Sequence, residues 1–229
     1  MKNLNIFSLI TEYENAKSGG VLNKPNVSFV DEDSSVRYLI DPYNGYEYVD
    51  LGLSVKWATC NVGATSPEQA GLYFAWGETT GYTGADVRSE IRQFTEDVYK
   101  AGPAASINTD LTLEQDAAHA NMGGNWRMPT KDEYQELLDN CTMMWTANYS
   151  GTGVAGKVFT SKVNGKSVFF PATGSCWYSL VENFGSEGCY WSASWDSEYN
   201  AGYFFFNSDV HDLWWGGRYY GYSVRGVCE

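Results

Sequence analysis

The feature that most constrains this chain is the aromatic segment from Tyr190 to Val224, because no single core can enclose all of it. Roughly two in five residues there are Trp, Tyr or Phe, against 16% of the whole chain, and Gly, Ser, Asn and Asp fill most of the rest. Rigid rings separated by small polar residues are typical of a recognition surface, because Tyr and Trp give contact area at low entropic cost. A core of aromatic strands explains some of these rings, but Trp214 and Trp215 stand beside Asp209 and Asp212. We therefore expect part of the segment to lie at the surface.

The length and charge of the chain limit its organisation and its partners. With 229 residues it can bury one good-sized core, or one core with a small appendage. The net charge of −13 argues against a nucleic-acid backbone or an anionic membrane as the main partner. It favours a soluble protein whose target is neutral, glycan-like or basic.

The cysteines and histidines do not form a metal-binding pattern. Five cysteines occur without a C-x-x-C spacing, and His119 and His211 are the two histidines. Buried thiols are the favoured interpretation, and one disulfide late in the chain is the alternative. The sequence therefore predicts no zinc site.

Residues 1–45 are expected to form an N-terminal attachment segment, and residues 46–229 the body. Apolar residues at helical spacing predict a short helix over 4–13, and two strands at 21–30 and 36–40 flank a turn at 31–35. So short a helix must dock on the body, on a partner chain or on a larger assembly. No signal peptide and no stretch long enough to span a bilayer is recognised, so we expect synthesis in the cytoplasm and no membrane span.

Within the body, the strongest local signal is a capping box. Thr130 as N-cap with Glu133 three residues later predicts a helix to about 140, with Tyr134, Leu137 and Leu138 on its buried side. Short helices are also predicted from Ser66 and within 111–120, and a long surface excursion over 78–110. Strands are predicted within 48–60 and at 145–149, 156–160 and 167–171, the last two joined by a type I′ turn at Asn164-Gly165.

Known catalytic motifs are not found in the sequence. It contains no phosphate-binding loop, no H-E-x-x-H, no G-x-S-x-G and no EF-hand loop. His211 has no obvious nucleophile beside it, and His119 is interpreted as structural. Arg127, Arg218 and Arg225 lie among aromatic residues and glycines, and we interpret them as framework arginines that bond to carbonyls or stack on rings. We expect no catalytic residue and no metal ligand.

Several motifs resemble, in their order along the chain, the major paralogous domain family common in gut Bacteroidetes such as Bacteroides and in their phages. They cover about residues 46–228 and are Tyr48–Leu53, Trp57–Ala64, Tyr73–Glu78, Gly124–Thr130, Tyr190–Ser194 and Phe206–Ser208, then Arg218, Gly221 and Ser223–Arg225. That family is similar to the C-type lectin fold in its formylglycine-generating-enzyme branch. The closing part resembles the variable region of proteins diversified by retroelements, in which a reverse transcriptase rewrites adenine-bearing codons.

The resemblance implies an α+β, C-type lectin-like fold with short antiparallel strands, two or three short helices and much loop. It also implies that framework residues hold the fold while the positions between them vary and bind the ligand. The implied framework residues are Trp191, Ser192, Ser194, Phe206, Asn207, Ser208, Val210, Arg218, Gly221, Ser223, Val224 and Arg225. The implied ligand-binding positions are Trp195, Asp196, Glu198, Tyr199, Gly202, Tyr203, Phe205, Asp209, His211, Asp212, Trp214, Trp215, Tyr219, Tyr220 and Tyr222.

Two details bear on these positions. Tyr203 and Phe205 alternate with Phe204 and Phe206, which fits a strand with one face inward and one outward. Rewriting asparagine codons that end in a pyrimidine cannot produce Trp, so the tryptophans among the ligand-binding positions need another template codon or are fixed.

The function implied by the resemblance is recognition of a protein or glycan receptor on a bacterial surface, without enzyme activity. Such a protein is encoded by a phage or prophage and carried on the phage particle, with virion attachment or self-assembly through residues 1–45. The alternatives are a fixed adhesin subunit and an oxidase related to formylglycine-generating enzymes, although Cys176, Cys189 and Cys228 lack the setting of that enzyme's cysteine pair. The calcium motif of true C-type lectins is absent, so no cofactor is expected and bound calcium is left open.

Overall fold

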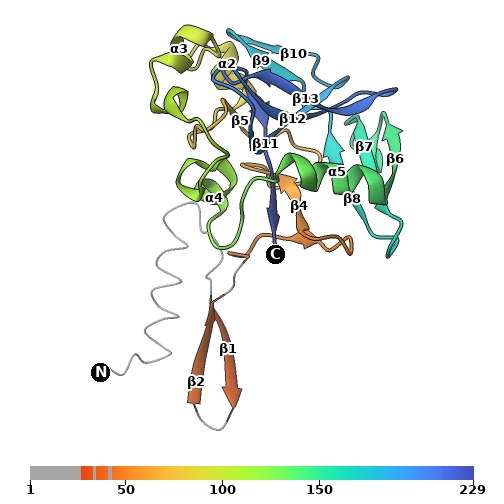
Figure 1. Cartoon of the computed structure of the whole chain (residues 1–229). Helices are drawn as coiled ribbons and strands as arrows, with labels where there is room; N and C mark the ends of the chain where they lie inside the picture. The colour runs from red at the N-terminus through yellow and green to blue at the C-terminus, as the bar shows by residue number, and fades with distance from the viewer. Residues whose placement is uncertain (1–26, 33–34, 41–42) are drawn as a thin grey trace, which may run out of the picture. The chain divides into compact units, whose positions relative to one another are not determined.

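The computed structural model describes residues 27–32, 35–40 and 43–229 (Figure 1). The chain divides into two compact units, residues 1–45 and 46–229, which are described separately. In the first unit, β1 (Val27–Glu32) pairs antiparallel with β2 (Ser35–Ile40), and Glu32 lies opposite Ser35. The two strands extend into the turn expected at 31–35, since Asp31, Glu32 and Ser35 belong to the strands. The helix expected over 4–13 and the start of the first strand at 21–26 lie outside the described residues.

The largest sheet of the body has five strands and is formed mainly by the end of the chain. Its order is β13-β12-β11-β14-β5. The strands β11 (Gly188–Trp195), β12 (Asn200–Phe206) and β13 (His211–Gly217) form an antiparallel meander, visible in Figure 1 in the blue part of the chain. The short strands β14 (Tyr222–Ser223) and β5 (Tyr73–Phe74) complete the sheet, with β14 parallel to β11. The aromatic segment is therefore mainly a sheet.

Three smaller antiparallel sheets surround the large one. The first contains β15 (Arg225–Cys228), β4 (Lys56–Asn61) and β3 (Tyr48–Val49), in that order. The second contains β6 (Cys141–Thr146), β7 (Gly156–Ser161) and β8 (Ser167–Pro171), in that order. The third is the pair of β10 (Leu180–Glu182) and β9 (Ser175–Trp177). The helices of the body are α2 (Gly84–Arg88), α3 (Glu96–Lys100), α4 (Ala117–Met122) and α5 (Lys131–Asn140). Single 3₁₀ turns span Pro103–Ser106, Leu113–Gln115 and Tyr149–Gly151. The prediction of an α+β chain with small, mostly antiparallel sheets and few helices is confirmed.

The core is built largely from aromatic rings that α5 covers. Tyr134 of α5 is fully buried, with its ring centroid 5.2 Å from that of Trp57 and 5.2 Å from that of Phe204. Leu137, one helical turn further, joins the same cluster. The predicted capping box is confirmed, since the Thr130 side chain accepts the Glu133 N–H and the Glu133 carboxylate accepts the Thr130 N–H. The box thus defines the start of the helix, and Tyr134 packs the helix on Phe204 of β12.

Two fully buried arginines tie distant parts of the body together. The Arg225 guanidinium donates to the carbonyls of Ala58, Thr59 and Phe169 and to Asn61 Oδ1, all at 2.8–3.0 Å. Burial lowers the pKa of Arg225 below its ordinary value.

Arg218 donates to the carbonyls of Ala104 (2.6 Å) and Glu198 (3.1 Å), and its guanidinium lies 4.7 Å from the Trp76 ring. The framework interpretation is confirmed for both arginines. Arg127 also donates to a carbonyl, that of Met128 (3.2 Å), and in addition makes a two-pronged ion pair with Glu133.

Two predicted elements are wrong: the helix expected from Ser66 and the type I′ turn at Asn164-Gly165. Residues 66–69 form a turn and not a helix, and the Gln69 side chain accepts the Thr65 N–H. The Asn164-Gly165 turn is not of type I′, because Gly165 has a positive φ but Asn164 does not. Asn164 is held elsewhere: its amide donates to the Asp50 carbonyl, and the Ser161 hydroxyl accepts its N–H.

Other predicted elements need changed bounds. The strand predicted at 145–149 ends at Thr146, and Tyr149 stacks on Phe169 at 3.8 Å. The helix predicted within 111–120 is two pieces, because Asp116 caps a new helix at Ala117. Residues 78–110 contain α2 and α3, and Phe94 and Tyr99 are buried there, so the excursion is partly core.

All five cysteines are free, and four of them are buried while Cys60 is partly exposed, so the buried-thiol interpretation is confirmed. In the part of the chain that the structure describes, no helix is long and apolar enough to cross a membrane.

Candidate functional site

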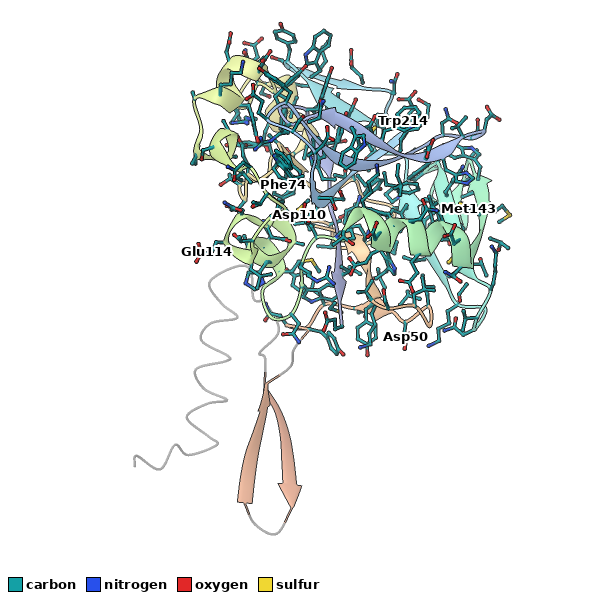
Figure 2. All side chains as sticks on the ribbon, in the orientation of Figure 1. Asp50, Phe74, Asp110, Glu114, Met143 and Trp214 are labelled. Carbon is teal, nitrogen blue, oxygen red and sulfur yellow. The ribbon has the colours of Figure 1, made fainter. Side chains whose placement is uncertain are left out.

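The strand β13 is an outer strand of the large sheet and carries two exposed tryptophans. It pairs with β12 in a register that sets Trp214 opposite Tyr203 and Trp215 opposite Gly202. Because side chains alternate along a strand, the two indoles lie on opposite faces of the sheet. Trp214 is 41% exposed and Trp215 44% exposed. Figure 2 labels Trp214 on the ribbon of β13.

Trp214 belongs to a continuous series of ring contacts across the sheet. It stacks on Phe205 with centroids 4.3 Å apart, and meets Tyr203 edge-on at 6.2 Å. Tyr203 lies 4.8 Å from Tyr222, which in turn stacks on Tyr220 at 5.8 Å. The exposed Trp214 ring and the partly exposed Tyr220 ring at the two ends are therefore held by buried rings between them.

The hairpin β9–β10 extends this series. The Trp177 ring lies 6.4 Å from that of Tyr220, and a β-bridge joins Cys176 to Gly221. Trp177, Tyr178 and Leu180 are 40%, 53% and 57% exposed. We call the exposed and partly exposed rings of this region the aromatic surface: Trp177, Tyr178, Trp214, Tyr219 and Tyr220.

Sequence reasoning missed the contribution of β9–β10 to the aromatic surface. The run Trp177-Tyr178-Ser179-Leu180-Val181 is a signal, since so many large apolar side chains within a few residues need a core or a partner. Tyr178 adopts a left-handed φ of 51°, which places it at the tip of the hairpin. No local pattern in the sequence shows that this tip lies beside Tyr220.

A small cleft lies beside the aromatic surface, between α3 and the loop after β13. It has a volume of about 150 Å³, and its lining includes Lys100, Tyr199, Arg218 and Tyr219. The Lys100 ammonium pairs with Glu96 at 2.6 Å and lies 5.9 Å from the Tyr199 ring centroid. The cleft is large enough for one small side chain or one sugar hydroxymethyl group.

The predicted ligand-binding positions fall into three groups by exposure. The exposed ones are Asp196, Glu198, Tyr199, Asp209, His211, Asp212, Trp214 and Trp215, and the partly exposed ones are Trp195, Tyr219 and Tyr220. Gly202, Tyr203, Phe205 and Tyr222 are buried, so the expectation that these four are displayed is wrong.

The physical reason is that neighbouring side chains cover them. Trp215 packs close to Gly202, and Tyr222 lies among the rings of Trp191, Tyr203 and Tyr220. Tyr203 and Phe205 do face away from the core residues Phe204 and Phe206, as the alternation predicts, but Trp214 lies over both. Two predicted framework residues, Ser208 and Val210, are exposed in the turn before β13.

Burial is the main cause of the pKa shifts in and beside the aromatic surface. Burial, followed by the neighbouring Tyr219, raises the pKa of Tyr220 to about 12. Burial also raises the pKa of Tyr203 and Tyr222 above their ordinary values, and their hydroxyls bond to each other. Burial and then Lys157, whose Nζ lies 3.3 Å from Nδ1, lower the pKa of His211.

This arrangement supplies rings, phenol hydroxyls and carboxylates, which are groups that bind. His211 contacts an ammonium group and not a hydroxyl or thiol nucleophile. Among residues 43–229 and the described hairpin, no group of three His, Cys, Asp or Glu side chains could hold a metal ion.

A second, larger cleft lies elsewhere in the body. It has a volume of about 530 Å³, and its lining includes Glu78, Arg92 and Glu114. The Arg92 guanidinium pairs with Glu78 at 2.8 Å. None of the predicted ligand-binding positions lines this cleft.

Comparison with protein families, with curated proteins and with solved structures finds no match to this chain.

Proposed function

We propose that this chain is a ligand-binding protein that recognises a receptor on a bacterial surface through the aromatic surface. The observation that carries the proposal is the exposure of Trp214, which is held in place by its stack on the buried Phe205. An exposed ring whose orientation is fixed loses little conformational entropy on binding. Aromatic anchors of this kind dominate the energetics of protein interfaces.

The surroundings of Trp214 support the same proposal. Tyr219 and Tyr220 stack on each other at 4.7 Å, so two further rings are oriented before any ligand arrives. Gly217 leaves room for these two rings, because an added Cβ there would lie 2.9 Å from the Tyr219 ring and 3.2 Å from the Tyr220 ring. Exposed Asp196, Asp209 and Asp212 add hydrogen-bond acceptors around the rings.

For the fold, we propose a C-type lectin-like body of the formylglycine-generating-enzyme type over residues 46–229. The buried Trp191, Arg218 and Arg225 support it, since each belongs to the framework that the family resemblance implies. We further propose that the closing segment is the variable region of a retroelement-diversified protein, encoded by a phage or prophage. Residues 1–45 would attach the body to the virion or to further copies of the chain.

A binding experiment tests the role of the aromatic surface. The immobilised chain is used to capture bacterial cells and surface extracts from gut Bacteroidetes, and the bound species is titrated against variants. Trp214→Ala and Tyr220→Ala are each expected to weaken binding by about 30-fold, corresponding to about 2 kcal/mol. Met144→Ala is the matched control, because Met144 is 64% exposed but lies on β6. Equal effects of all three variants would contradict the proposal.

Variation in the source population tests the diversification proposal separately. Codons 185–229 are sequenced deeply, with codons 46–90 as the control region. Substitutions concentrated at exposed positions such as Tyr199 and Asp212, with Arg218 and Arg225 constant, are expected. A uniform segment would instead favour a fixed adhesin that uses the same surface.

A further inference from the structure

Two hydrogen bonds determine which backbone groups of β13 face outward. The Asn207 N–H donates to the Val210 carbonyl (2.9 Å), and the Arg218 N–H donates to the Tyr199 carbonyl (3.0 Å), at opposite ends of the β12–β13 pairing. Bonded and non-bonded pairs alternate in an antiparallel ladder. Because the register between these two ends is uninterrupted, the backbone groups of Asp212, Trp214 and Gly216 bond to β12. The N–H and C=O groups of Leu213 and Trp215 therefore point to the opposite edge.

That opposite edge carries no strand. Among the sheets that the structure describes, β13 is terminal and pairs with β12 alone. The Leu213 N–H is bonded to the Asp212 carboxylate at 2.8 Å, which leaves the Leu213 carbonyl and both backbone groups of Trp215 for a further strand. Edge strands are usually protected by being very short, by proline, by a bulge or by charge. β13 is seven residues long, contains no proline and pairs without a bulge.

The side chains of β13 provide contacts on both faces of such a strand. A strand added at this edge would lie about 4.8 Å from β13 and send alternate side chains to each face of the sheet. On one face they would meet Trp214, stacked on Phe205. On the other face they would meet Trp215, whose ring lies 3.7 Å from the Lys131 ammonium. Both indoles are therefore positioned to cover side chains of an incoming strand.

The charge around the edge selects the occupant. Exposed carboxylates of Asp209, Asp212 and Asp132 lie on β13, on the turn before it or beside Lys131. Two ammonium groups offset part of this negative charge, since Lys131 lies over Trp215 and Lys157 donates to the Val210 carbonyl at 3.1 Å. Pairing two copies of the chain through this edge would bring together two net charges of −13. A basic segment of a different protein is the complementary partner.

We propose that the outer edge of β13 binds an extended, basic segment of a protein ligand as an additional strand of the sheet. The inference rests on the proposed function, because it assigns the ligand of the aromatic surface to the class of proteins rather than glycans. Backbone bonds to Leu213 and Trp215 supply the pairing, and the two indoles and the acidic residues select the side chains.

Peptide binding to the full chain tests the inference. The probes are fluorescent peptides of about nine residues that alternate lysine with valine or threonine, and a matched set with glutamate in place of lysine. Lysine peptides are expected to bind and to weaken at least about tenfold as salt rises from about 50 to 300 mM, while glutamate peptides do not bind. When one peptide nitrogen at a time is methylated, binding is expected to be lost only for methyl groups at alternate positions of the peptide, because every second N–H faces β13. No binding of any lysine peptide up to about 1 mM, or an N-methyl scan without period two, would overturn the inference.

A pair of variants isolates the backbone of β13. Trp215→Pro removes the outward N–H, whereas Trp215→Thr keeps it and removes the same ring. Binding is expected to be at least about tenfold weaker for the proline variant than for the threonine variant. Equal binding by the two would contradict strand addition. The N-methyl scan uses the unchanged protein, so it decides the question even where Trp215→Pro does not fold.

Two further outcomes separate this inference from the proposed function. A captured receptor that depends on Trp214 but binds Trp215→Pro and Trp215→Thr equally would leave the proposed function standing and reject strand addition. Sedimentation that shows a dimer of the unchanged chain, lost in Trp215→Pro, would make a second copy the occupant and also reject the basic ligand.

Discussion

The indole of Trp214 lies flat on the phenyl ring of Phe205, with centroids 4.3 Å apart and planes 8° from parallel. Trp214 faces Tyr203 directly in the register, so Phe205 is its diagonal neighbour on the same face of the sheet. Trp214 is 41% exposed and Phe205 is 7% exposed. The stack therefore joins one ring available to a ligand to one ring that belongs to the fold.

The two rings are expected to differ in their contribution to stability. Trp214→Ala removes a half-exposed ring and one stack, and is expected to lower the free energy of unfolding by about 1 kcal/mol. Phe205→Ala leaves a cavity under Trp214 and is expected to cost about 3–4 kcal/mol. Urea denaturation followed by far-UV circular dichroism measures both. A larger loss for Trp214→Ala would show that Trp214 is chiefly a core residue and not a binding anchor.

Arg225 is expected to be the most sensitive arginine of the body. Its guanidinium satisfies four acceptors from β4 and β8, and a lysine ammonium cannot reach them all. Arg225→Lys is therefore expected to destabilise the fold by about 3–5 kcal/mol, because buried carbonyls lose their donors. The control is Arg88→Lys at the exposed end of α2, with a change within about 0.5 kcal/mol. Similar thermal unfolding of the two variants would contradict the claim that the fold depends on the hydrogen bonds of Arg225.

The ion pair of Glu133 with Arg127 predicts a specific acid dependence of stability. Burial alone raises the pKa of the Glu133 carboxyl, but hydrogen bonds from Arg127 and Thr130 outweigh burial and lower it below 4.5. Because the pKa is lower in the folded chain, the ion pair stabilises the fold fully at a pH above the pKa of Glu133 in the unfolded chain. This stabilisation is lost as the pH falls through the pKa of Glu133 in the folded chain.

Glu133→Gln is therefore expected to be less stable at pH 7, by about 2 kcal/mol, and to lose less stability on acidification below pH 4.5. Urea denaturation at a series of pH values measures the slope. Asp132→Asn is the matched control, because Asp132 is the exposed neighbour of Glu133 on the same helical turn. An unchanged acid slope in Glu133→Gln would place the acid sensitivity in other groups.

Local signals predicted the elements whose hydrogen bonds are themselves local. The capping box at Thr130 and the strand pairing on either side of residues 162–165 depend on residues a few positions apart, and both are present. The turn at Asn164 was predicted wrongly because a distant carbonyl, that of Asp50, holds its side chain.

In the candidate site too, features set by neighbouring residues were predicted, and features set by distant contacts were not. Alternation correctly gave the two faces of β12, but could not reveal that the Trp214 ring of β13 packs on Tyr203 and Phe205. Likewise, the exposure of Trp177 beside Tyr220 depends on a contact between residues more than forty positions apart. Exposure within an aromatic-rich segment follows from strand order, and strand order was not readable from spacing alone.

The thiols provide a prediction that also tests the oxidase alternative. The thiolate is the reactive form of cysteine, so burial that raises a thiol pKa makes that thiol inert. Burial raises the pKa of Cys141 and Cys228 to about 11, and raises the pKa of Cys176 and Cys189 further. Cys60 is partly exposed. An aromatic disulfide reagent at pH 8 is therefore expected to label Cys60 promptly and the four buried thiols only after unfolding in denaturant.

Cys60→Ser is the control for this assignment and is expected to remove the prompt phase completely. Mass spectrometry of the labelled peptides identifies the reacting residue. Prompt labelling of Cys176 or Cys189 in the native chain would contradict the burial argument, because it requires an accessible thiolate of the kind that a cysteine-dependent oxidase needs. With inert thiols, loss of receptor binding after alkylation would have to arise at Cys60, on β4, and not at the aromatic surface.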